Sequence, residues 1–111
     1  IYLGKVPFVD PLGTLSDPSL PLTVNEWEEF GNPLESPPEL EAIRDLSPAS
    51  NVVAGKAYPP MLLRPAKNDA RTGWWEAFKF AANVNSFGAP ESGLGPVGGA
   101  TVDLSLGGHF W

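Results

Sequence analysis

The second half of the chain follows a strand, loop, helix, linker, strand order, and this order constrains the fold more than any other feature. The apolar residues at 60–64 follow a Pro-Pro turn and predict a buried strand. Residues 71–84 carry aromatic and small apolar side chains at spacings of three and four, which predicts a helix. Apolar side chains alternate over 101–106 and predict another strand. Because this rhythm is typical of a parallel sheet, we expect an α/β fold.

Turn-forming residues divide the remainder of the chain into shorter elements. Residues 6–9 predict a short strand, and Val24–Phe30 predicts a helix whose acidic side chains suit the positive end of the helix dipole. A second short helix is expected at Glu39–Asp45. Residues 85–99 contain five glycines and two prolines, and we expect an irregular, mobile linker there.

The helix predicted at 71–84 has an apolar and a polar face. We expect Trp74, Trp75 and Phe78 to pack in the core, because burying such large side chains is worth about 1.5–3 kcal/mol each. The same spacing places Glu76 and Lys79 on the polar side.

Composition argues against several classes of function. Thirteen acidic residues against seven basic ones give a net charge of -6, whereas a nucleic-acid binder needs clustered Lys and Arg. The absence of cysteine excludes a disulfide scaffold, a thiolate zinc site and cysteine catalysis. A single histidine leaves little for a metal centre.

The ends of the chain and its apolar runs bear on location. No run approaches the roughly 18 apolar residues that span a bilayer, and no signal peptide opens the sequence. We therefore expect a cytoplasmic protein without membrane contact. The first residue is Ile1 rather than Met, which favours a processed piece or a fragment of a longer protein.

Two polar residues follow the predicted strands at 60–64 and 101–106. In a parallel sheet, ligands and catalytic groups collect at the carboxyl ends of the strands, so we expect Asp69 and His109 to lie close together. An Asp followed by a His matches the order of the Ser-Asp-His triad in α/β-hydrolases. The alternative is that Asp69 is a turn or cap residue and His109 belongs to an ordinary loop. No Gly-x-Ser-x-Gly occurs, so the nucleophile of such a triad is missing from the sequence.

Several segments resemble the prolyl oligopeptidase family of serine peptidases, and within it the oligopeptidase B group. The matching blocks occur in the family's order and cover most of the chain. They are Val6-Pro7-Phe8-Val9-Asp10, Pro21-Leu22-Thr23-Val24, Glu26-Trp27-Glu28-Glu29-Phe30-Gly31-Asn32-Pro33, Ser47-Pro48 with Asn51-Val52, Tyr58-Pro59-x-Met61-Leu62, Asn68-Asp69-x-Arg71, Trp75-Glu76-x-x-Lys79 and Gly108-His109. Arg64-Pro65 departs from the pattern, because a proline inside a central strand would remove a ladder hydrogen bond.

This resemblance implies a partial α/β-hydrolase with mostly parallel short strands and packed helices. Residues 1–111 would be the C-terminal part of a peptidase domain, without the nucleophile segment and the closing helix. By family position, Asp69 is the triad carboxylate and His109 the general base. The missing nucleophile segment and a β-propeller that screens the entrance would belong to the parent protein. The family needs no cofactor, and the 111-residue chain by itself would be inactive.

The resemblance also implies which residues bind substrate. Glu26 and Glu28 match an acidic pair in the pocket that receives an Arg or Lys side chain, and Asp17 matches an acid of the neighbouring pocket. The whole protein would then cut short peptides after basic residues, in agreement with the acidic charge. The alternatives are that the glutamates form a solvated helix face and that the chain is a non-catalytic remnant, or pseudoenzyme, binding basic peptides.

Overall fold

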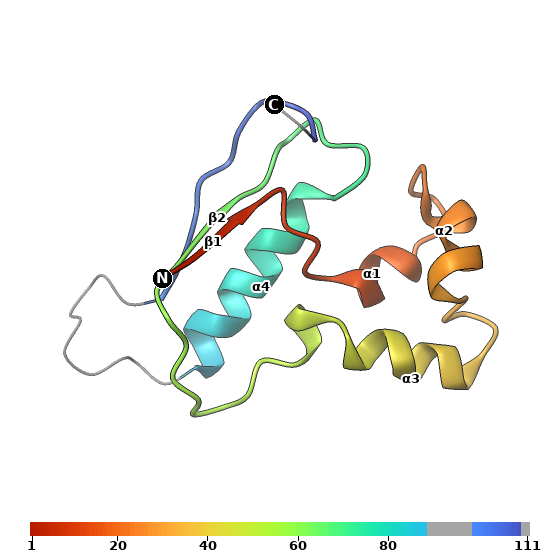
Figure 1. Ribbon diagram of the computed structural model, residues 1–111, viewed down its shortest axis with the longest axis horizontal. Coiled ribbons are helices and arrows are strands. Elements are labelled where there is room, and N and C mark those ends of the chain that lie inside the picture. Colours follow the sequence, from red (N-terminus) through yellow and green to blue (C-terminus); the bar gives the residue numbers. More distant parts are fainter. Residues whose placement is uncertain (89–98, 110–111) are drawn as a thin grey trace.

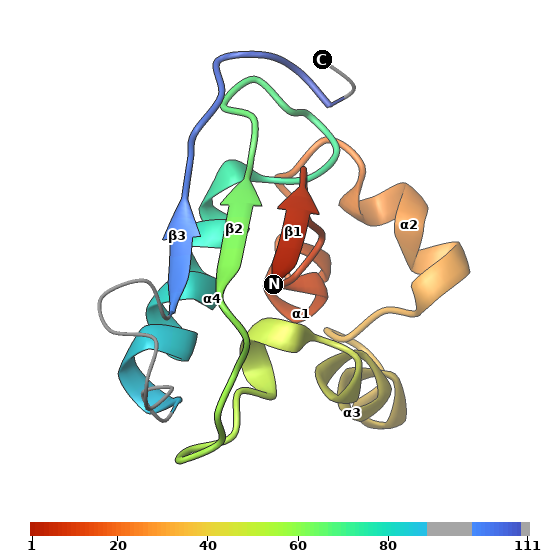
Figure 2. The ribbon, with the colours of Figure 1, turned by 60° about the vertical axis from the view of Figure 1, so that its left-hand side comes forward.

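The computed structural model describes residues 1–88 and 99–109, and its centre is a three-stranded parallel sheet. The strands are β1 (Tyr2–Lys5), β2 (Met61–Arg64) and β3 (Ala100–Val102), with β2 in the middle. The pairing runs from Tyr2 with Met61 to Lys5 with Arg64, and from Met61 with Ala100 to Leu63 with Val102, so all three strands are parallel. Figure 2 shows them side by side. The predicted α/β class is confirmed.

Two strand predictions require correction. The strand expected at 6–9 is absent, and β1 lies just before it, because Val6 has a φ of 42° that breaks extended pairing. The strand expected at 101–106 is reduced to Ala100–Val102, with one isolated bridge from Ser105 to Ala66.

Pro65 lies just after the central strand, where its missing N–H removes no hydrogen bond of the sheet. The central strand ends at Arg64, one residue earlier, so no ladder bond requires an N–H from Pro65. Its carbonyl oxygen still accepts a hydrogen bond of 2.9 Å from the backbone N–H of Ser105. The departure from the family pattern is therefore compatible with a central strand.

The helices flank the sheet on one face and at one edge. They are α1 (Pro11–Leu15), α2 (Thr23–Phe30), α3 (Pro37–Asp45), the 3₁₀ turn η1 (Pro48–Ser50) and α4 (Trp74–Phe87). Figure 2 shows α4 behind the strands, α1 behind β1, and α2 and α3 to the side of β1. The predicted helices near α2, α3 and α4 are confirmed as elements. No helix in the two described ranges is long and apolar enough to cross a membrane.

The longest helix starts and ends three residues later than predicted. It begins at Trp74 because residues 69–72 form the loop that carries Asp69, and it continues through Phe87. The start of the predicted linker at 85–99 is therefore helical rather than irregular. Residues 89–98 of that linker lie outside the described residues.

The core lies between α4 and the sheet, and apart from Phe80 it is built from small and medium-sized side chains. Leu63 of β2 packs there with Ala77, Phe80 and Val84 of α4. Alanines on the inner face allow the helix to lie close to the strands. The predicted faces of α4 are therefore wrong. The face that packs on the sheet carries Ala77, Phe80 and Val84, and the large aromatic residues expected there lie elsewhere on the helix.

The three aromatic side chains expected in the core lie on the outer side of α4. Trp74, Trp75 and Phe78 are 36–42% exposed and pack edge to face against one another, with ring centroids 5.7–6.0 Å apart. Glu76, expected on the polar side, is completely buried. The aromatic rings gain contact with each other rather than with the sheet.

Candidate active site

The chain segments that follow β2 and β3 run side by side beyond the sheet (Figure 1). The parallel pairing continues there, because the N–H of Lys67 donates to the carbonyl of Ser105 and that of Asn68 to the carbonyl of Gly107. The side-chain amide of Asn68 also donates to the Leu106 carbonyl at 2.6 Å. These bonds bring Asp69 and His109 to the same end of the sheet.

At that end, Nδ1 of His109 lies 2.7 Å from Oδ2 of Asp69. The Asp69 side chain is fully buried, and 23% of the His109 side chain remains exposed. The expectation that strand order brings these two residues together is confirmed. Nδ1 is therefore the ring nitrogen that faces the carboxylate, and Nε2 lies on the opposite side of the imidazole ring.

The other carboxylate oxygen of Asp69 is held by the backbone. Oδ1 accepts hydrogen bonds from the N–H groups of Arg71, at 2.8 Å, and Thr72, at 3.0 Å. Asp69 therefore closes the turn that leads into α4, which is the alternative role expected from the sequence. The same side chain also faces His109. Both oxygens have partners, which fixes the orientation of the carboxylate toward the imidazole.

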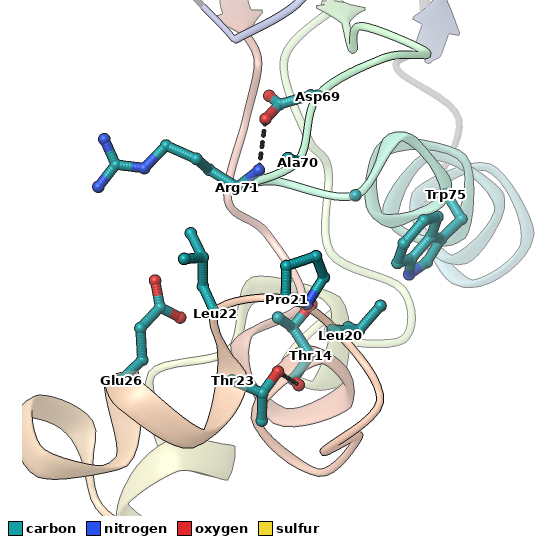
Figure 3. Close-up of a pocket in the computed structure, with 11 residues that line it drawn as sticks. Thr14, Leu20, Pro21, Leu22, Thr23, Glu26, Asp69, Ala70, Arg71 and Trp75 are labelled. Carbon is teal, nitrogen blue, oxygen red and sulfur yellow. Dashed lines mark hydrogen bonds between the residues drawn. The ribbon is translucent and has the colours of Figure 1, made fainter.

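Two pockets adjoin this pair. A cavity of about 130 Å³, here the Asp69 pocket, lies between the segment joining α1 to α2 and the Asp69 loop (Figure 3). A more open cavity of about 340 Å³, the His109 pocket, lies next to it. The Asp69 pocket is lined by Thr14, Leu20, Pro21, Leu22, Thr23, Glu26, Asp69, Ala70, Arg71, Gly73 and Trp75. The His109 pocket is lined by Phe8, Glu26, Glu29, Phe30, Arg71, Thr72 and His109.

Of the three predicted substrate-binding carboxylates, only one lines these pockets. Glu26 lines both of them, whereas Glu28 is exposed and lines neither. Asp17 is exposed in the turn after α1, where hydrogen bonds from the side chain and backbone of Ser19 lower the pKa of its carboxyl. The structure thus brings Glu26, but neither Glu28 nor Asp17, to the pockets beside Asp69 and His109.

Arg71 lines both pockets and Glu29 lines the His109 pocket, and neither was among the predicted site residues. Glu29 follows Glu26 by three positions, a spacing that places both on one face of α2. Glu28 lies about 200° around the helix from Glu26. Helical spacing was the signal that could have identified Glu29. Arg71 lines both pockets, and Figure 3 shows it on the same side of the Asp69 pocket as Glu26.

A second buried carboxylate lies in the first turn of α4. Glu76 accepts hydrogen bonds from the backbone N–H of Asp10, at 2.7 Å, and from the hydroxyl of Thr14, at 2.9 Å. Burial raises the pKa of Glu76 from its ordinary value of 4.5 to about 7, although both hydrogen bonds favour the ionised form. The side chain of Asp10 is also buried and forms an ion pair of 2.8 Å with Lys79.

Comparison with known proteins identifies the family. The model of the prolyl oligopeptidase family matches residues 2–93, a range that includes Asp69 and ends before His109. Dipeptidyl aminopeptidase BI of Pseudoxanthomonas mexicana is 39% identical over 97 residues, which are 87% of this chain and 13% of that protein. Protease 2 of Moraxella lacunata is 40% identical over 86 residues, which are 78% of this chain and 12% of that protein.

Solved structures agree with the sequence matches. Oligopeptidase B from Leishmania major superposes with a TM-score of 0.83 at 33% identity, over 97% of this chain and 14% of that one. Oligopeptidase B from Trypanosoma brucei, in a closed form with covalently bound antipain, gives 0.84 at 34% identity, over 98% and 14%. The chain thus spans only 12–14% of the length of these four proteins. It has a partial α/β-hydrolase fold and belongs to the prolyl oligopeptidase family of serine peptidases.

Proposed function

We propose that this chain supplies the Asp and the His of a Ser-Asp-His triad in a serine endopeptidase that cleaves short peptides after Arg or Lys. The observation that carries the proposal is the 2.7 Å contact between Asp69 and His109 beside pockets lined by Glu26. The nucleophilic serine would come from another segment of the parent protein. The cytoplasmic location and the screening propeller that the resemblance implies belong to the same proposal.

The geometry supports a definite division of roles. Nε2 of His109 takes the proton of the serine hydroxyl as its oxygen attacks the scissile carbonyl, and later gives that proton to the leaving amine. Asp69 keeps the proton of the imidazole on Nδ1 and stabilises the imidazolium that forms. Water then attacks the acyl-enzyme by the same route, which releases the acid product and restores the serine. Every proton in this cycle moves through His109, so the step needs no cofactor.

Carboxylates near the pockets support the choice of a basic side chain. Glu26 lines both pockets, and a carboxylate binds a guanidinium through charge-assisted, often bidentate hydrogen bonds. Glu28 and Asp17 are the further acidic residues that the family resemblance assigns to substrate. The proposal includes them as contributors to binding once the rest of the protein is in place.

A panel of chromogenic peptides tests this function in the complete peptidase. The substrates carry Arg, Lys, Pro or Ala at the cleaved bond, each with a blocked and with a free amino terminus. We expect turnover of blocked Arg and Lys peptides, with His109→Ala inactive. A preference for Pro or Ala peptides, or a requirement for a free amino terminus as the name dipeptidyl aminopeptidase describes for one relative, would contradict the proposed specificity.

The competing interpretation is a pseudoenzyme that binds basic peptides. Its signature is saturable binding of an Arg peptide by the complete protein without hydrolysis. Equilibrium binding measured in parallel with turnover therefore separates the two functions. Binding without turnover would leave Glu26 with a role in recognition and remove the catalytic roles of Asp69 and His109.

A further inference from the structure

A chain of buried hydrogen bonds connects α2 to the first turn of α4. Its side chains are almost inaccessible to solvent: Thr23 is 1% exposed, Thr14 is 5% exposed and Glu76 is fully buried. Buried polar groups of this kind are costly to the fold unless each is paired, and here each one is. Thr14 and Thr23 also line the Asp69 pocket, and none of the three side chains takes part in the proposed proton transfers.

The contacts run continuously from one helix to the other. The hydroxyl of Thr23 donates to the carbonyl oxygen of Thr14 at 2.8 Å, and the hydroxyl of Thr14 donates to Oε2 of Glu76 at 2.9 Å. The other oxygen of Glu76 accepts from the backbone N–H of Asp10 at 2.7 Å. Thr23 is the first residue of α2, Thr14 lies in α1 and Glu76 lies in α4.

Both ends of this chain lead to the site. Glu26, which lines both pockets, follows Thr23 by three residues in α2. At the other end, the backbone N–H of Glu76 donates to the carbonyl of Gly73, next to Thr72, whose own N–H holds Asp69. Hydrogen bonds through Thr14 and Glu76 therefore connect α2 to the loop that carries Asp69.

We propose that Thr23, Thr14 and Glu76 form a positioning relay that sets Glu26 of α2 relative to the Asp69–His109 pair and thereby determines the preference for basic substrates. The inference rests on the proposed function, since it assigns Glu26 to the substrate's positive charge. The three relay residues act through Glu26. They are positioning residues, and the proposed chemistry continues without them.

Directionality is the reason for assigning this role to hydrogen bonds. Packing of α1 against α2 would by itself tolerate a sliding of one helix along the other, because burial of apolar surface is non-directional. A hydroxyl that must reach a particular carbonyl oxygen restricts such sliding. A second bond, from the indole Nε1 of Trp27 to the carbonyl of Leu15 at 2.8 Å, lies one turn further along α2. It keeps α2 attached when the first bond is removed.

The test uses Thr23→Val in the complete peptidase, because valine keeps the shape of the side chain and removes only the hydroxyl. We expect KM for a blocked Arg peptide to rise about tenfold, as the loss of one positioning hydrogen bond allows. Because Thr23 also lines the Asp69 pocket, the deciding quantity is the ratio between two substrates, and we expect kcat/KM for the Arg peptide to fall about tenfold relative to kcat/KM for an ester without a charged side chain. Thr23→Ser restores the hydroxyl and should restore the wild-type KM.

A matched control separates positioning from general loss of stability. The side-chain amide of Asn83 donates to the carbonyl of Ala49 at 2.8 Å, so Asn83→Leu also deletes one side-chain bond to a backbone oxygen, on α4 and away from α2. We expect this variant to keep the wild-type ratio between the Arg peptide and the uncharged ester. Equal losses for both substrates in Thr23→Val, or an unchanged KM, would overturn the relay.

The kinetics of Glu26→Gln and Thr23→Val together distinguish an error in the proposed function from an error in the relay. If Glu26→Gln leaves hydrolysis of Arg peptides unchanged, then the acidic site itself is wrongly assigned, and the relay has no target. If Glu26→Gln weakens Arg peptides while Thr23→Val does not, then only the relay is wrong. The two variants together therefore assign any negative result to one proposal or the other.

Discussion

His109 and Asp69 lie 40 residues apart in sequence, yet Nδ1 of the imidazole is 2.7 Å from a carboxylate oxygen of Asp69. The contact exists because the segments after β2 and β3 continue the parallel pairing beyond the sheet, as far as the bond between Asn68 and Gly107. Backbone N–H groups hold the second oxygen of Asp69, so the carboxylate has little freedom to turn away. A general base requires this orientation.

Asp69→Asn tests the orientation of the imidazole in the complete peptidase. The amide oxygen of asparagine can accept the two backbone N–H groups, which leaves the amide NH₂ facing Nδ1 of His109. Nδ1 must then become the acceptor and Nε2 carries the proton, which is the wrong tautomer for a general base. We expect kcat to fall by roughly 10⁴-fold, as in other serine peptidases with this change. Steady-state kinetics on an Arg ester measures the effect.

The circular dichroism spectrum serves as the control for Asp69→Asn. The spectrum should match that of the wild type, because the turn keeps its hydrogen bonds. A loss of less than about tenfold with an unchanged fold would mean that Asp69 acts only as a turn residue.

Single substitutions in α2 test the acidic pocket. Glu26→Gln should lower kcat/KM for Arg peptides by about 10–100-fold, because a charge-assisted bond to a guanidinium contributes about 1.5–3 kcal/mol. Peptides with an apolar residue at the cleaved bond should change by no more than about twofold. Kinetics on the two substrate classes, measured side by side, gives the comparison.

Glu29→Gln and Glu28→Gln provide the internal comparison. Glu28 and Glu29 are both exposed, but only Glu29 shares a pocket and a helix face with Glu26. From this geometry we expect a smaller effect for Glu28→Gln than for Glu26→Gln. A larger effect would mean that other parts of the protein bring Glu28 to the substrate, as the family resemblance implies.

The 111-residue chain by itself should lack covalent reactivity. None of its eight serines lies in a Gly-x-Ser-x-Gly sequence, so the chain lacks the motif that would present a serine nucleophile for deprotonation by His109. We expect no labelling by a fluorophosphonate probe and no turnover of an Arg ester above the background rate. Intact-mass spectrometry after incubation with the probe decides the point. An adduct on any serine would show that the triad is completed within this chain.

The sequence was sufficient to predict the parallel sheet and the proximity of Asp69 to His109. Both follow from a general property of such sheets, namely that the carboxyl ends of neighbouring strands meet at one edge. The faces of α4 could not be predicted in this way. Large aromatic residues at helical spacing indicate a core, but here Ala77 and Ala81 face the sheet and the aromatic side chains pack on one another.

Glu76 was missed for a related reason. A glutamate three residues before a lysine in a helix indicates a face that is exposed to solvent. The sequence of α4 itself does not show that the hydrogen-bond partners of Glu76 come from residues 10–14. Its burial depends on a contact between segments more than 60 positions apart in sequence. Such long-range pairing of a polar group leaves no periodic signal.

The buried carboxylate of Glu76 should make the stability of the 111-residue chain depend on pH. Its pKa is 4.5 ordinarily and about 7 in the folded protein, so between these values the folded state binds the proton more tightly than the unfolded state. Unfolding then releases a proton, and raising the pH favours unfolding. This contribution to stability is complete below pH 4.5 and is lost as the pH rises through 7.

Glu76→Gln isolates this effect, because the glutamine oxygen can still accept from the backbone N–H of Asp10 while its amide group donates to the hydroxyl oxygen of Thr14. Relative to the wild type, the free energy of unfolding of the variant should rise between pH 4.5 and pH 7.5 by on the order of 3 kcal/mol, since a difference of one in pKa corresponds to about 1.4 kcal/mol. Urea unfolding followed by tryptophan fluorescence at a series of pH values measures both curves. Asn83→Leu, which carries no titratable group, should run parallel to the wild type. Parallel curves for Glu76→Gln and the wild type would show that Glu76 keeps its charge at pH 5 in the folded protein, and that its hydrogen bonds from Asp10 and Thr14 outweigh the cost of burial.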